Sequence, residues 1–161
     1  MPKIEVMSHP EVTVVGLKYH GKNQAGEIPQ LWQEINQYWD KIQALDEAAH
    51  AGYGVSIMGE DFEKTMVFDY FAGFPVLDEE VQQPEGLVSY TIPEGEYAVI
   101  TVPNLESIMK AYDAVYRWVA QSEDYELDLS TGNFNFELYG EEFMPAEGSK
   151  KFYIYVPVKE K

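Results

Sequence analysis

The sequence contains no cysteine. Disulfide bonds, thiolate catalysis and cysteine-based zinc sites are therefore excluded. No stretch approaches the roughly 18 uninterrupted apolar residues that indicate a membrane-spanning helix. The first residues also lack the apolar run of a secretory signal peptide. These absences are typical of a protein in a reducing compartment, and we predict a cytoplasmic location with no membrane contact.

Basic residues are scarce as well. Lys and Arg number 11 against 28 Asp and Glu, which gives a formal net charge of −17. Such a chain repels the phosphate backbone, so we expect no direct contact with nucleic acid. The same field concentrates cations near the surface and steers cationic ligands towards the protein. The alternative is that the acidity only keeps the protein soluble.

Motifs for metals, cofactors and nucleophilic catalysis are missing. The three histidines (His9, His20 and His50) lack the spacing of metal ligands. The sequence has no phosphate-binding loop, dinucleotide fingerprint or nucleophile elbow. We therefore predict no metal and no cofactor. Carboxylates and tyrosines remain as the groups able to carry chemistry.

A repeat is present instead. The segments "YGVSIMGEDF" (Tyr53–Phe62) and "FNFELYGEEF" (Phe134–Phe143) are similar, with one in each half of the chain. Each follows a β-rich segment and an amphipathic helical pattern, and each precedes a strand that ends in Pro-Val. The β-rich segments are Glu11–Gly21 and Glu96–Val102, and the helical patterns are Ile28–Ile42 and Leu105–Val119. The apolar stripe of the second helical pattern consists of Leu105, Ile108, Met109, Tyr112, Val115, Tyr116 and Val119.

This order predicts one α+β domain over residues 1–161, a tandem duplication of a βαββ unit. The half-repeats would occupy about 1–76 and 95–161, with a linker at 77–94. Two such units would share an antiparallel sheet with two long helices on one face. The other face would stay open.

Side chains alternate along the strand "FNFELYG". We expect the apolar set (Phe134, Phe136 and Leu138) to pack under the helices and the polar set (Asn135, Glu137 and Tyr139) to face the open side. The residues of the first half that correspond to the polar set are Gly54, Ser56 and Met58. Two of these are small, which leaves room beside Glu137. The alternative is a solvated carboxylate on an exposed face.

The three tryptophans differ in their place on the helical patterns. Trp118 lies off the apolar stripe of its helix, so it either contacts a ligand or covers the sheet edge or the "SEDYEL" segment that follows. Trp32 and Trp39 lie on their stripe and are predicted as core residues. Trp39, near the helix end, is also a candidate pocket residue.

The whole pattern resembles the GyrI-like effector-binding domains, which also occur fused to AraC-type and MerR-type regulators. The resemblance covers nearly the whole chain and is carried by "GEIPQLWQEI", "YGVSIMGED", "FDYFAGFPV", "EGEYAVITV", "AYDAVYRWVAQSEDYEL" and "FNFELYGEEF". It implies a cleft between the halves that binds cationic, lipophilic ligands. A glutamate in a "F-E-x-Y" strand meets the cation, and aromatic side chains line the walls.

The resemblance implies a set of ligand-binding residues. Glu137 and Tyr139 match the strand motif, and Trp118 matches the tryptophan of the second helix. The remaining candidates are Trp39, Asn135, Ser56, Met58 and Tyr70. A carboxylate walled by aromatic rings loses solvation, so we expect the pKa of Glu137 to be raised while no cation is bound.

Three functions remain open. We favour a binding module that acts as a stand-alone sensor or sequestering protein, because no helix-turn-helix segment occurs in the sequence. The first alternative is a hydrolase of reactive small molecules that uses glutamate as acid and base. The second is an acidic inhibitor of a DNA-binding enzyme such as gyrase. A separate regulator or gyrase would be the protein partner, and the sequence allows a monomer or a dimer.

Overall fold

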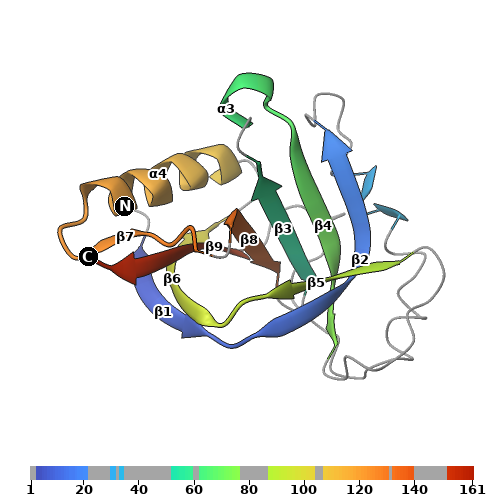
Figure 1. The fold of residues 1–161 in the computed structure, drawn as a ribbon, viewed down its shortest axis with the longest axis horizontal. Coiled ribbons are helices and arrows are strands. Elements are labelled where there is room, and N and C mark those ends of the chain that lie inside the picture. Colours follow the sequence, from blue (N-terminus) through green and yellow to red (C-terminus); the bar gives the residue numbers. More distant parts are fainter. Residues whose placement is uncertain are drawn as a thin grey trace.

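The computed structural model describes residues 3–21, 30–31, 33–34, 52–59, 62–76, 87–103, 107–130, 132–139 and 152–161. Within them, nine strands form one antiparallel sheet, and Figure 1 shows α4 across one end of it. The strands are β1 (Ile4–His9), β2 (Val12–Gly21), β3 (Gly52–Met58), β4 (Phe68–Val76), β5 (Val88–Ile92), β6 (Gly95–Val102), β7 (Tyr125–Leu127), β8 (Asn133–Tyr139) and β9 (Phe152–Glu160). Two helices have their bounds within the described residues, α3 (Phe62–Thr65) and α4 (Ile108–Gln121), and residues 30–31 and 33–34 are helical as well.

The strand order is β1-β6-β9-β8-β3-β4-β2-β5, with β7 paired to β9 beside this path. The centre of the sheet is the β3–β8 pair, in which Gly54 lies opposite Glu137 and Ser56 opposite Asn135. Strands that sequence patterning predicted in the two halves therefore meet in the middle. The α+β class with an antiparallel sheet, predicted from the sequence, is confirmed.

Three strands were not predicted from the sequence. β1 pairs with β6 at one edge, β5 pairs with β2 at the other, and β7 pairs with β9. β5 lies inside the segment predicted as a linker. Most of the predicted first helix, Trp39 included, lies outside the described residues, and so does the second Gly-Glu-Glu-Phe segment. Leu31 of the predicted first helix is described, and it packs on Tyr70 and Ala72.

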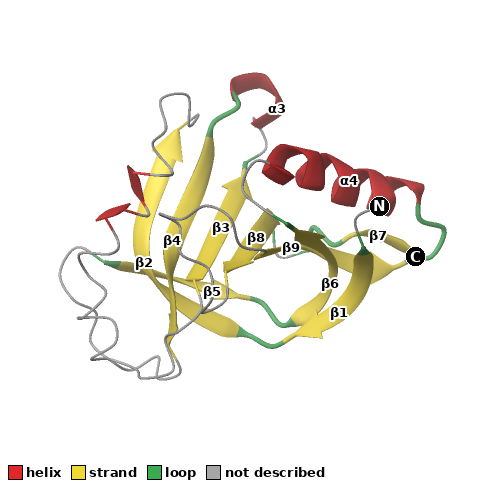
Figure 2. Ribbon diagram, turned by 180° about the vertical axis from the view of Figure 1, so that it is seen from behind, coloured by secondary structure: helices red, strands yellow, loops and turns green. Residues whose placement is uncertain are grey.

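The sheet is strongly curved, as Figures 1 and 2 show from opposite sides. Gly16 and Gly73 lie opposite each other on β2 and β4. A Cβ on Gly16 would lie 1.9 Å from the Ala72 carbonyl oxygen, and one on Gly73 would lie 2.3 Å from the Val15 carbonyl oxygen. Glycine is therefore required for the close approach of these two strands.

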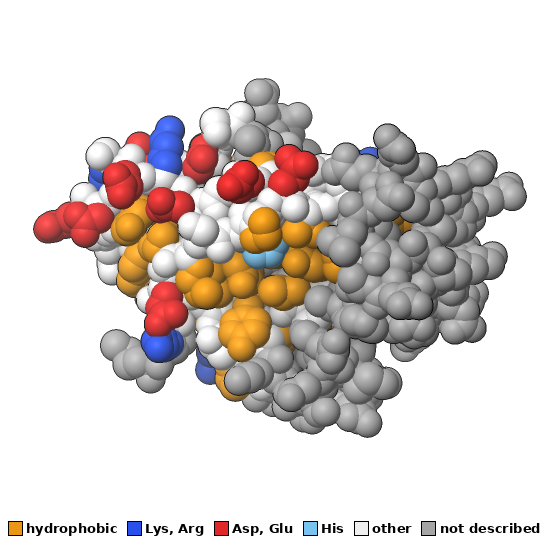
Figure 3. All heavy atoms as spheres, turned by 90° about the horizontal axis from the view of Figure 1, so that it is seen from below, with side chains coloured by type: hydrophobic (Ala, Val, Ile, Leu, Met, Phe, Trp, Pro, Cys, Tyr) orange, Lys and Arg blue, Asp and Glu red, His pale blue; other side chains and the backbone are white. Residues whose placement is uncertain are grey.

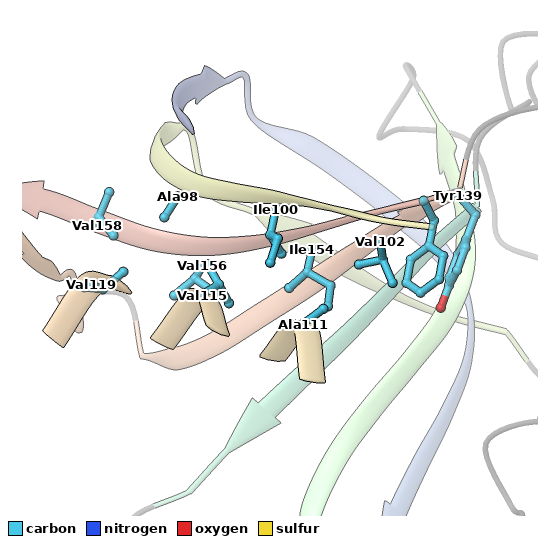
Figure 4. Packing of buried hydrophobic residues seen from close by; sticks show 11 residues of the cluster. Ala98, Ile100, Val102, Ala111, Val115, Val119, Tyr139, Ile154, Val156 and Val158 are labelled. Atoms are coloured by element: carbon cyan, nitrogen blue, oxygen red, sulfur yellow. The ribbon is translucent and has the colours of Figure 1, made fainter. Parts of the chain in front are cut away.

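One core lies between α4 and the sheet. Ala111, Val115 and Val119 are the buried residues of α4, and they pack on apolar side chains of β6 and β9 (Figure 4). The helix begins at Ile108, later than the predicted Leu105. Met109, predicted on the apolar stripe, is 75% exposed, so the buried stripe is rotated relative to the prediction.

A second core fills the other face of the sheet. Phe134 and Phe136 of β8 are buried there with Tyr53, Tyr97 and Tyr155. The expectation that the phenylalanines of β8 pack under the helices was wrong, and so was the expectation of an open second face. Within the described residues, the curved sheet packs its own aromatic side chains against one another, which removes them from water. Figure 3 shows hydrophobic side chains gathered on the lower side of the molecule.

His9 belongs to this second core. Its ring meets Tyr53, Tyr97, Phe136 and Tyr155 edge-on, with centroid distances of 5.2–6.1 Å. Nδ1 lies 2.8 Å from the carbonyl oxygen of Pro10, and Nε2 lies 3.3 Å from the Tyr53 hydroxyl. Burial lowers the pKa of His9 below its ordinary 6.5, so the ring is held in its neutral form.

Candidate functional site

Glu137 lies on the helix side of β8 and is only 5% exposed. Its neighbours along the strand alternate, so Asn135 and Tyr139 point to the same side. The sequence correctly separated this polar set from the phenylalanines. It placed the polar set on the wrong side, because which face α4 covers depends on the packing of the helix and not on strand alternation.

Three tyrosine hydroxyls donate hydrogen bonds to the Glu137 carboxylate. Tyr70 of β4 reaches Oε1 at 3.0 Å, Tyr139 binds the same oxygen, and Tyr112 of α4 binds Oε2. These donors come from three different elements. We call Glu137 and these three tyrosines the carboxylate cluster.

Gly54 makes one of these contacts possible. It lies opposite both Glu137 and Ala72 on the neighbouring strands. A Cβ at this position would lie 1.9 Å from the Tyr70 hydroxyl oxygen and 3.0 Å from Glu137 Oε1. The room that the sequence predicted beside Glu137 therefore exists, and the Tyr70 hydroxyl occupies it.

Two opposing effects act on the acidity of Glu137. Burial raises the pKa of its carboxyl group, while the hydrogen bonds from Tyr112, Tyr139 and Tyr70 pull the pKa down. The net direction is upward, as predicted from the sequence. Burial, followed by the nearby charge of Glu137, also raises the pKa values of Tyr112 and Tyr139 well above 10. The hydroxyls of Tyr112 and Tyr139 therefore keep their protons and remain donors.

No basic side chain of the described residues forms an ion pair with Glu137. A buried carboxylate without a cationic partner is unusual, because such groups are normally paired. The described part of the chain likewise contains no group of three His, Asp or Glu side chains placed to hold a metal ion. Glu137 can thus accept a cation, and the described residues supply no basic side chain that would compete for it.

A second pair of polar groups lies beside the cluster. Asn135 Nδ2 donates to the Tyr116 hydroxyl at 2.9 Å, and Ser56 lies opposite Asn135 on β3. Met58, two residues further along β3, is half-buried and pairs with Phe68 and Asn133. Sequence reasoning included Asn135, Ser56 and Met58 but missed Tyr112 and Tyr116, which it assigned to the apolar stripe.

Tyr112 and Tyr116 are identified by helix geometry. Each follows a buried residue, Ala111 or Val115, by one position, which is a rotation of about 100° around the helix. That rotation turns their rings from β6 and β9 towards β8. Two tyrosines spaced by four on the flank of a helix were the signal available in the sequence.

Trp118 does not join the carboxylate cluster. It lies on the opposite flank of α4, about 160° from Tyr116. Its ring stacks on Tyr125 of β7, with a centroid distance of 6.4 Å and an interplanar angle of 25°. The predicted place of Trp118 beside Glu137 is therefore taken by Tyr112. Trp118 covers the "SEDYEL" segment, which was the alternative interpretation.

A surface hollow of about 310 Å³ lies near this end of the helix, lined by Glu123, Asp124, Tyr125, Glu160 and Lys161. None of its lining residues belongs to the carboxylate cluster.

Within the described residues, no helix is long and apolar enough to cross a membrane.

The fold is thus a curved antiparallel sheet with α4 across one end and a buried glutamate, Glu137, on the helix side. Residues 5–158 match the family model of the integron-associated effector binding protein, Cass2, and the chain belongs to this family. The predicted resemblance to effector-binding domains is confirmed.

Individual relatives agree with this assignment. The chain is 26% identical over 155 residues to the transcriptional regulator BrlR of Pseudomonas aeruginosa, covering 95% of this chain and 54% of BrlR. It therefore spans about half the length of that relative.

Two solved structures share the fold. The EcmrR C-terminal domain is similar with a TM-score of 0.71 at 14% identity, over 100% of this chain and 99% of that chain. SAV2435 bound to tetraphenylphosphonium is similar with a TM-score of 0.66 at 18% identity, over 98% and 94% of the two chains.

Proposed function

We propose that this domain binds small lipophilic cations, with Glu137 as the counter-ion and tyrosine rings as the walls of the site. The observation that carries the proposal is a buried carboxylate bonded by three tyrosine hydroxyls with no basic partner among the described residues. The hydroxyls replace water around the carboxylate, so an entering cation meets a fixed acceptor.

The energetics fit a ligand of moderate affinity. Each aromatic face adds roughly 0.5–2 kcal/mol of attraction for a cation. Micromolar binding needs only about −8 kcal/mol in total. One ion pair with Glu137 and a few of the surrounding rings are sufficient. The net charge of −17 also favours the approach of a cation.

The ligand class has further support from one structural neighbour. SAV2435 was solved with tetraphenylphosphonium, a lipophilic cation. We also propose that the chain is a duplicated βαββ unit, that the ligand binds in a cleft between the two halves, and that the protein acts on its own as a sensor or sequestering protein. The symmetric opposition of Gly54 to Glu137 and Ser56 to Asn135 at the centre of the sheet supports the duplication.

The test is calorimetric titration of the protein with tetraphenylphosphonium. We expect micromolar binding by the unmodified chain and a loss of at least about tenfold in Glu137→Gln, the scale of one charge-assisted contact. Glu126→Gln is the matched control, because it removes the same charge from an exposed position on β7. Equal losses in both variants would show that only the overall field matters, and no binding by the unmodified chain would reject the proposal.

The hydrolase alternative requires a second acidic group near the first. Among the described residues, the side chains that hydrogen-bond to Glu137 are all tyrosines. We therefore place binding ahead of turnover. Mass spectrometry of the ligand after incubation would detect any product, and turnover abolished by Glu137→Gln would reverse this order.

A further inference from the structure

The side-chain oxygen of Asn135 is a buried acceptor with nothing to accept. The residue is 4% exposed, and its Nδ2 is already bonded to the Tyr116 hydroxyl. Its Oδ1 has no hydrogen-bond partner in the part of the chain that the structure describes. A buried polar atom without a hydrogen-bond partner destabilises the folded state. Native proteins leave few such atoms, so a missing partner calls for a physical explanation.

The position of this oxygen connects it to the carboxylate cluster. Asn135 precedes Glu137 by two residues on β8, so both side chains leave the same face of the sheet about 6.6 Å apart along the strand. The two residues are also bound by tyrosines one turn apart on α4, Tyr116 and Tyr112. One ligand lying between α4 and β8 would thus meet both acceptors.

The neighbouring strand leaves this second acceptor open. Ser56 lies opposite Asn135, as Gly54 lies opposite Glu137. Ser56 is buried, and its short side chain does not reach Asn135 Oδ1 with a hydrogen bond. The acceptor is therefore available to a donor that the described residues do not supply.

We propose that Asn135 Oδ1 is a second polar contact of the ligand site and selects cations that carry at least two N–H groups. This inference rests on the proposed function and names its ligand class: primary or secondary ammonium ions and amidinium ions. One N–H donates to the Glu137 carboxylate, and the other donates to Asn135 Oδ1. A quaternary cation satisfies the charge of Glu137 but leaves the amide oxygen unpaired.

The physical basis is the cost of an unpaired group. Sites that hydrogen-bond a polar ligand discriminate strongly against analogues without the donor, because a buried partner then remains unsatisfied. Discrimination by shape alone is weaker when analogues differ by one or two methyl groups. A series of cations that differ only in N-methylation therefore isolates the role of Asn135.

The experiment measures the dissociation constants of three probes by calorimetry: benzyldodecylammonium, its N-methyl derivative and its N,N-dimethyl quaternary derivative. They carry two, one and no N–H groups on the same framework. In the unmodified protein we expect the largest loss of affinity between the first probe, with two N–H groups, and the second probe, with one. In Asn135→Leu the affinity ratio between the first and last probes should shrink by about tenfold, the value of one charge-assisted hydrogen bond.

Asn133→Leu is the matched control, because it makes the same change at an exposed position of the same strand. It should leave the ratio unchanged. If Asn135→Leu does not fold, Asn135→Ala removes the same oxygen without added bulk, and the three-probe series in the unmodified protein tests the proposal without any variant.

The outcomes separate this inference from the proposed function. Equal responses of the unmodified protein and Asn135→Leu to the three probes, with all probes bound, would overturn the role of Asn135 and assign its missing partner to a buried water. Failure of all three probes and of tetraphenylphosphonium to bind the unmodified protein would instead reject the proposed function itself.

Discussion

Two ionisable side chains, one on each face of the sheet, are surrounded by aromatic residues. Glu137 on the helix side receives three tyrosine hydroxyls. His9 on the other side meets four rings edge-on, with one tyrosine hydroxyl and one backbone carbonyl near its nitrogens. Burial disfavours the charged form of both groups, raising the pKa of Glu137 and lowering that of His9.

The difference lies in what the surroundings offer to a charge. The hydroxyl protons of the carboxylate cluster point at Glu137 and stabilise its ionised form, which burial opposes. The rings around His9 fill space and supply no carboxylate to the imidazole. We interpret the first environment as prepared for an ionic ligand and the second as a packed core that keeps its histidine neutral. Five predictions test this contrast.

The largest effect should come from the second core. Phe136 is fully buried and stacks on Tyr155 at a centroid distance of 4.6 Å. Truncation in Phe136→Ala should lower the free energy of unfolding by about 3–5 kcal/mol. Chemical denaturation measures this loss. A cost below that of Phe136→Leu would contradict the assignment of this face as core.

Gly54→Ala should come next, because the new Cβ would overlap the Tyr70 hydroxyl. We expect a loss of about 1–3 kcal/mol in the free energy of unfolding, the usual cost of overpacking. Gly59→Ala is the control, since a Cβ there meets no atom within 4 Å.

The clash can be tested further in a Tyr70→Phe background, which lacks the hydroxyl oxygen. Gly54→Ala should cost less there than in the unmodified chain. An equal cost in both backgrounds would mean that Gly54 matters for its backbone and not for the room it leaves to Tyr70.

A smaller, pH-dependent effect is expected for Glu137→Gln. Because the folded pKa of Glu137 is raised above 4.5, the folded state binds its proton more tightly than the unfolded state does. The stabilising contribution of Glu137 is therefore complete at acidic pH and is lost as the pH rises through the folded pKa. Stability measured against pH should show Glu137→Gln gaining on the unmodified protein from about pH 4.5 upward.

Ligand binding should respond in the opposite sense. A cation prefers the ionised carboxylate, so affinity for tetraphenylphosphonium should fall as the pH drops below the raised pKa. Affinity that is independent of pH in the unmodified protein would contradict a direct contact with Glu137.

The smallest effect should come from His9→Gln. The lowered folded pKa of His9 means that the unfolded chain takes up a proton more readily as the pH falls through 6.5. The unmodified protein should therefore lose stability relative to the variant between neutral pH and about pH 5, by no more than about 1.4 kcal/mol per unit of difference in pKa. A gain in that range would mean that the aromatic surroundings favour the charged ring.

Local patterns in the sequence predicted much of the fold. The β-rich segments before each helical pattern are β2 and β6, and alternation along β8 placed Asn135, Glu137 and Tyr139 on one side. These predictions succeeded because strand alternation and helical periodicity depend on neighbouring residues only. The edge strands β1 and β5 were missed, since their pairing depends on partners distant in sequence.

The candidate site was likewise predicted only in part from the sequence. The sequence by itself determined that Glu137 stands in an alternating strand, that Gly54 and Ser56 are small, and that the chain is strongly acidic. Only the tertiary structure decided which face α4 covers and which tyrosines reach the carboxylate. Sheet curvature and the rotation of a helix arise from contacts between remote segments, so Tyr112 meets Glu137, 25 residues away in the sequence, for reasons that no local pattern contains.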